Sequence, residues 1–179
     1  MRSAVAIAVL LASVPLFAQS RKDPLTDQQI EEVREAGIDP PGRIKLFVGY
    51  VDDRAKAIHT LNSQKSAQNK AVRLHNLYDE FTRLSDDLQD NMDQFDQQHA
   101  DLRKELKVVS DKTTEWATIL NEPPADSQYD FVRKTAIDSN QSAHESAAAM
   151  ITDEEKYFAE QKRLQKEQEK KQAEDEHSR

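Results

Sequence analysis

The stretch "QDNMDQFDQQHADLRKEL", residues 89–106, contains no glycine, no proline and few apolar side chains. Its apolar residues and one histidine follow one another at spacings of three or four: Met92, Phe95, His99, Leu102 and Leu106. Such spacing places side chains on one face of an α-helix. The stretch therefore predicts a helical seam that continues through position 99, although a kink near residues 97–100 stays open.

The same seam extends in both directions along the chain. From Leu74 to Leu120, 13 steps of three or four residues cover 46 positions, with two consecutive steps of four meeting at Leu88. This is the periodicity of a heptad coiled coil with a single stutter. One continuous helix over this length would be about 70 Å long.

Residues that break or cap helices predict three further helices. Thr26 and Gln29 form a capping box before a short helix at 27–36, and a helix at 40–61 begins at two prolines. The polar stretch 62–69 and the "NEPPADS" segment at 121–127 are the expected turns, and the last helix carries small residues from 143 to 149.

These elements predict an all-α protein: an elongated, coiled-coil-like antiparallel helical hairpin preceded by two shorter helices. In the hairpin, residues whose numbers sum to about 248 face each other. This register places Ala147 opposite Leu102 and Tyr157 opposite Met92.

Residues 1–20, "MRSAVAIAVLLASVPLFAQS", are typical of a bacterial secretory signal. Arg2 precedes an apolar run, and cleavage after Ala18 or Ser20 satisfies the small-residue rule. A retained membrane anchor is the alternative, but the apolar run of about 15 residues is shorter than the roughly 20 that a span needs. We therefore expect export to the periplasm or beyond, a helical domain at 21–165, and a charged tail at 166–179 that is a fraying helix or disordered.

Composition argues against several classes of partner. The chain has a net charge of −8, and the predicted leader carries one basic and no acidic residue, so its removal gives −9. An acidic surface disfavours nucleic acid and anionic lipid. The absence of cysteine excludes disulfides, thiolate metal sites and covalent haem.

Motifs for catalysis or cofactor binding are weak. His99 with Met150 or Met92 matches the ligand types of a haem iron, but the facing helix is rich in alanine, which favours seam packing. Glu174 and His177 form the only Glu-x-x-His spacing, and a di-metal site needs two. No Gly-x-Ser-x-Gly is present. The sequence thus predicts a protein that is not an enzyme and holds no cofactor or metal.

The segment "LTDQQ", Leu25 to Gln29, resembles the Leu-Thr-x-x-Gln motif of small all-helical periplasmic stress chaperones of the Spy and CpxP type. The resemblance covers five residues and implies a holdase function, with an exposed apolar groove between the second helix and the hairpin. The same residues also read as the capping box.

The favoured interpretation is a structural, spacer or protein-interaction role, with a protein partner or a second copy bound through a helical seam and no membrane insertion after cleavage. Four aromatic residues beside the seams are candidate contacts: Phe47, Tyr50, Tyr78 and Phe131. The alternative for each is packing at the edge of a seam.

Overall fold

A computed structural model describes residues 22–177 of the chain, so the predicted leader lies outside the described residues. Within this range the protein is all-α, as predicted. The helices are α1 (Asp27–Glu35), α2 (Pro40–Ser63), α3 (Lys70–Gln97), α4 (Arg103–Asn121) and α5 (Asp130–His177), and a 3-10 turn, η1 (Ala36–Ile38), joins α1 to α2. None of the helices among these residues is long and apolar enough to cross a bilayer.

The helix ends follow local signals that are visible in the sequence. Thr26 accepts a hydrogen bond from the backbone N–H of Gln29, while the Gln29 side chain accepts one from the N–H of Thr26, so the predicted capping box is confirmed. Pro40 begins α2, where a missing N–H leaves no hydrogen bond unmade. Asn69, the N-cap residue just before α3, has a left-handed backbone, φ 51°, which asparagine tolerates better than most residues.

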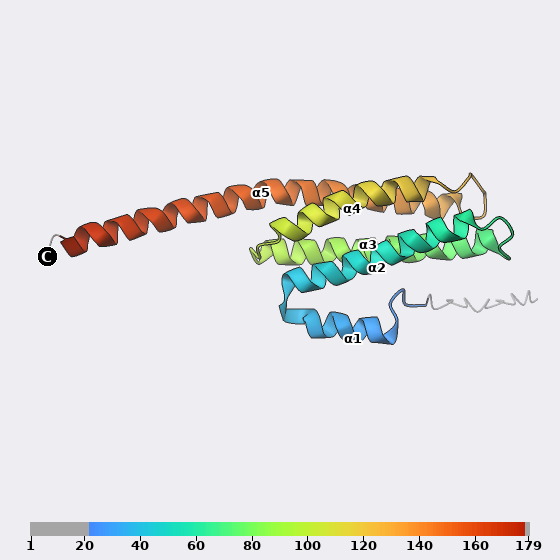
Figure 1. The fold of residues 1–179 in the computed structure, drawn as a ribbon, viewed down its shortest axis with the longest axis horizontal. Helices are drawn as coiled ribbons and strands as arrows, with labels where there is room; N and C mark the ends of the chain where they lie inside the picture. Colours follow the sequence, from blue (N-terminus) through green and yellow to red (C-terminus); the bar gives the residue numbers. More distant parts are fainter. Residues whose placement is uncertain (1–21, 178–179) are drawn as a thin grey trace, which may run out of the picture.

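Four helices form an antiparallel bundle (Figure 1). Helices α2 and α4 run in one direction, and α3 and α5 run in the other. Helix α2 packs against α3 and α4, and α5 packs against the same two helices, so α2 and α5 lie on one diagonal of the bundle. Helix α1 lies beside α2 at the edge.

The 74–120 seam does not lie on one continuous helix: the chain turns back at residues 98–102, between α3 and α4, which is the region where the sequence leaves a kink open. His99 takes a left-handed conformation, φ 55°, and the N–H groups of Gln98 and Ala100 both donate to the carbonyl of Phe95. These hydrogen bonds form a turn that ends α3 without a glycine or a proline.

The turn lets both halves of the seam face each other across the core. The rings of Phe81 and Trp116 meet edge to face at 5.9 Å between centroids, and the Tyr78 hydroxyl donates to the carbonyl of Leu120 at 3.1 Å. In one continuous straight helix, the rings of Phe81 and Trp116 could not contact each other. The seam positions themselves are nearly all buried, as their spacing predicts, except His99 and the half-buried Leu77.

Helices α4 and α5 form an antiparallel pair, shifted from the predicted register. The Asn140 side-chain amide donates to the carbonyl of Thr113, and the Glu154 carboxylate accepts from the N–H of Leu102. Paired numbers therefore sum to about 255 instead of 248. Tyr157 consequently lies against His99 instead of Met92, because α3 has already turned away.

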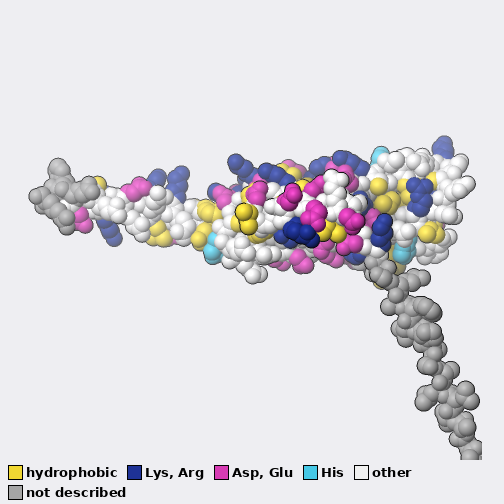
Figure 2. All heavy atoms as spheres, turned by 90° about the horizontal axis from the view of Figure 1, so that it is seen from below, with side chains coloured by type: hydrophobic (Ala, Val, Ile, Leu, Met, Phe, Trp, Pro, Cys, Tyr) yellow, Lys and Arg dark blue, Asp and Glu magenta, His cyan; other side chains and the backbone are white. Residues whose placement is uncertain are grey.

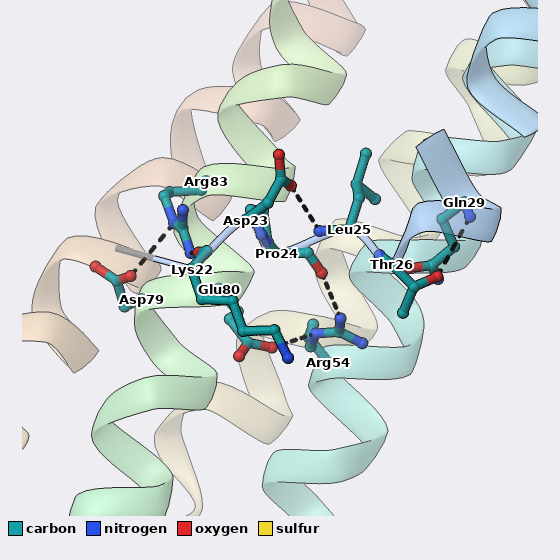
Figure 3. A network of polar contacts seen from close by, with 10 residues as sticks. All are labelled: Lys22, Asp23, Pro24, Leu25, Thr26, Gln29, Arg54, Asp79, Glu80 and Arg83. Atoms are coloured by element: carbon teal, nitrogen blue, oxygen red, sulfur yellow. Dashed lines mark hydrogen bonds and ion pairs between the residues drawn. The ribbon is translucent and has the colours of Figure 1, made fainter. Parts of the chain in front are cut away.

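The segment before α1 is fastened to α2 and α3 by two arginines (Figure 3). Arg54 donates to the carbonyl of Pro24 at 2.7 Å and to the Glu80 carboxylate at 2.6 Å. Arg83 donates to the carbonyl of Lys22 at 2.7 Å. Each guanidinium thus holds a backbone carbonyl against the bundle with charge-assisted hydrogen bonds.

Candidate interaction surface

Helix α5 continues well beyond the end of the bundle (Figure 1). Every residue from 159 to 175 is exposed. At 1.5 Å per residue, residues 159–177 reach about 28 Å from the last contact with the bundle. We call residues 159–177 the projecting segment.

A small aromatic cluster lies at the base of the projecting segment. The ring of His99 stacks on that of Tyr157, with centroids 4.5 Å apart and planes at 13°. Phe158 meets Tyr157 edge to face at 5.1 Å, and the guanidinium of Arg103 lies 4.6 Å from the centre of the Phe158 ring. Figure 2 shows hydrophobic side chains gathered at this junction, beside a histidine. The cluster joins the base of the projecting segment to the turn between α3 and α4 and to the start of α4.

Glu154 ties α5 to the start of α4 below this cluster. One carboxylate oxygen accepts from the N–H of Leu102 at 3.0 Å, which caps a helix whose own N-cap residue, leucine, has no acceptor. Burial raises the pKa of Glu154 above its ordinary range, and the nearby Asp101 and Asp96 raise it further, against the opposing effect of the Leu102 hydrogen bond. Its second oxygen has no hydrogen-bond partner among the described residues.

The uncharged side chains of the projecting segment lie almost entirely on one face. Residues 160–175 comprise ten charged and six uncharged residues. Five of the six follow spacings that place them on one helical stripe: Gln161, Leu164, Gln165, Gln168 and Gln172. We call these five residues the neutral stripe. Through Phe158, the stripe continues the face on which Glu154 and Ala147 are buried in the bundle.

On the opposite face of the segment, charged side chains form ion pairs with one another. Arg163 forms ion pairs with Glu160 at 2.6 Å and Glu167 at 3.9 Å, and Lys170 pairs with Glu174 at 4.0 Å. These pairs support an isolated helix by a few tenths of a kcal/mol each. The segment is thus built as a solvent-exposed helix with one face left neutral.

The four aromatic residues predicted as contacts are not brought together. Phe47, Tyr50 and Tyr78 are buried, so they serve the core, which was the alternative for each. The Tyr50 hydroxyl donates to Glu32 at 2.8 Å and so joins α2 to α1. Phe131 is 82% exposed, but it lies at the start of α5, at the end of the bundle away from the projecting segment.

The side chains considered as metal or haem ligands have other neighbours. Met92 is buried in the core, and His99 is exposed against Tyr157. Glu174 pairs with Lys170. Among the described residues, no three His, Cys, Asp or Glu side chains lie together as metal ligands would.

Comparisons with known proteins add no further constraint, because no protein-family model, curated protein or solved structure matches the chain. The apolar spacing that predicts the seams does not reveal the neutral stripe, because four of its five residues are glutamines. The sequence signal that reveals the stripe is the spacing of the uncharged residues within a charged helix.

Proposed function

We propose that this chain is an exported, non-enzymatic helical protein whose bundle displays the projecting segment of α5 for protein–protein interaction. The observation that carries the proposal is the neutral stripe, which continues the buried face of α5 into solvent. Helices pair through faces with this spacing, most often apolar ones, and polar residues at such positions lower the stability of the pair while specifying its register.

The arrangement of charge supports a binding role over that of a purely solvated extension. A purely solvated helix can carry charged residues on every side, so a face kept free of charge is the face that a partner helix can cover. Here the charges are concentrated on the outer faces, and several are satisfied within the helix. The bundle supplies a rigid base, because α5 is fixed by α3 and α4 before it projects.

Photo-crosslinking in the cells that produce the protein tests the proposal. A photoreactive side chain at Gln168, on the neutral stripe, should give a discrete cross-linked species. The matched control places the same group at Lys170, on the outer face, where we expect no such species. Equal labelling from both positions, or none from Gln168, would overturn the proposal.

A holdase function is the second candidate, and one depression on the bundle favours it. Between α2 and α3 lies an open hollow of about 400 Å³ whose lining includes Ala57, Leu61 and Leu77. An unfolded segment could place an apolar side chain there. The purified protein should then suppress aggregation of an unfolded substrate near equimolar ratio, and Ala57→Glu should abolish the effect. A chain without such activity would leave only the first proposal.

A further inference from the structure

We infer that the partner of the neutral stripe is a second copy of this chain, with the two projecting segments paired antiparallel. This inference rests on the proposed function and names the partner within it. It follows from the register of the stripe, the charges beside it and the charge of the bundle.

The stripe has the spacing of a coiled-coil seam. Steps of three and four residues lead from Phe158 along the glutamines: Gln161, Gln165, Gln168 and Gln172. Two such seams overlap along their whole length when paired residue numbers sum to 333. Gln161 of one copy then faces Gln172 of the other, and Gln165 faces Gln168.

Two glutamine seams can form hydrogen bonds with each other. Each side-chain amide both donates and accepts hydrogen bonds, so facing glutamines satisfy each other as they lose water. Leu164, which is 39% exposed in the single chain, then packs against the aliphatic part of Lys171 of the second copy. A polar seam costs stability relative to an apolar one, so the dimer should be weak and reversible.

The flanking charges match in the same register. Lys162 and Glu169 lie on one side of the stripe, at positions where an antiparallel pair brings Lys162 of each copy beside Glu169 of the other. Neither residue has an ion pair within the described part of the chain, whereas Arg163 and Lys170 on the outer face do. Glu169 only accepts a hydrogen bond from Gln165. Lys166 and Lys171 also lack an ion pair among the described residues. Lys162 and Glu169, however, are the two opposite charges that this register brings together, so a second copy would pair them.

The charge of the bundle favours antiparallel over parallel pairing. Residues 22–159 carry 17 basic and 27 acidic side chains, a net charge of −10, whereas residues 160–175 carry five of each. Parallel pairing would place two acidic bundles side by side. In the register of 333, residue 158 of one copy lies opposite residue 175 of the other, so antiparallel pairing separates the bundle ends by 17 residues, or about 26 Å, which exceeds the Debye length of about 8 Å at physiological salt.

Cysteine cross-linking tests the pairing directly, because the chain has no cysteine of its own. We use the purified mature chain, without the predicted leader, carrying either Gln161→Cys or Gln172→Cys. A mixture of the two variants should form a disulfide-linked dimer on mild oxidation. Neither variant alone should form this dimer. In the antiparallel pair like positions lie 11 residues, or about 16 Å, apart, far beyond the reach of a disulfide.

Charge reversal provides an independent readout by light scattering. Lys162→Glu and Glu169→Lys should each weaken dimer formation about tenfold, because two attractive contacts become repulsive. An equal mixture of the two variants should restore it, since opposite charges then face each other again. Lys170→Glu makes the same change in charge on the outer face and should leave association unchanged.

The outcomes separate this inference from the proposed function. Cross-linking of each single-cysteine variant alone, or a monomer at all concentrations, overturns antiparallel self-pairing. If the photo-crosslinked species from Gln168 then has a mass other than twice that of the chain, the interaction function stands with a different partner. If no such species forms either, both fail.

Discussion

At the scale of single residues, the buried carboxylate of Asp52 joins α2 to α4. It accepts from the indole N–H of Trp116 at 3.0 Å and from the Lys112 ammonium at 3.1 Å, and it pairs with Lys56 at 2.7 Å. Burial alone would raise the pKa of Asp52, but the hydrogen bonds from these three donors outweigh it and lower the pKa below its ordinary value.

Asp52→Ala should therefore lower the free energy of unfolding by about 2–3 kcal/mol, because it leaves the indole N–H of Trp116 buried without an acceptor. Asp52→Asn keeps an acceptor and should cost about 1 kcal/mol at pH 7. A lowered folded-state pKa gives stability above the ordinary carboxyl value, and this stability is lost as pH falls through the folded pKa. The difference between wild type and Asp52→Asn in urea denaturation should thus shrink below about pH 4; a constant difference would contradict this account.

Glu154 is expected to respond to pH in the opposite sense. Because its pKa is raised in the fold, its contribution to stability is greatest below the ordinary carboxyl pKa and is lost as pH rises through the raised value. Glu154→Gln keeps an acceptor for the N–H of Leu102, so we expect it to be at least as stable as wild type at pH 7. Glu154→Leu removes the acceptor and should cost about 1–2 kcal/mol. Thermal unfolding of both variants checks this, and a stable leucine variant would show that the cap is unimportant.

At the scale of elements, the starts of α1 and α2 and the seams could be predicted from sequence, whereas at 98–102 the sequence left a kink open and did not predict that the chain turns back. Thr26, Pro40 and the polar stretch after α2 are local signals. The turn at His99 has no glycine or proline, and the heptad spacing continues through it. Tertiary contacts hold it instead: the Glu154 cap, the His99–Tyr157 stack and the meeting of Phe81 with Trp116. The spacing of apolar residues in one sequence carries no information about these tertiary contacts.

The two parts of α5 should respond differently to proline. Ala147→Pro lies where α5 is buried and should cost about 3 kcal/mol or more, because it breaks a helix that the bundle needs. Gln168→Pro lies in the projecting segment and should leave the thermal unfolding of the bundle unchanged while reducing helical content measured by circular dichroism. A large loss of bundle stability from Gln168→Pro would show that the segment packs on the bundle.

At the scale of the whole molecule, the chain separates an acidic bundle from a projecting segment with no net charge over residues 160–175. The bundle keeps its aromatic side chains inside, with Phe131 as the main exception. The projecting segment is left as the part best suited to contact another molecule. That division depends on the turn between α3 and α4: with α3 folded back, α5 extends beyond the bundle instead of pairing along one long rod.

The distance between spin labels at Asn76 in α3 and Thr118 in α4, both exposed, measures this turn most directly. The contact between Tyr78 and Leu120 brings these ends of the two helices together, so double electron–electron resonance should give roughly 20–30 Å, including the labels. A continuous helix would separate the two positions by 42 residues, or about 63 Å. The short distance would support the bundle and the projecting α5, and the long one would contradict both.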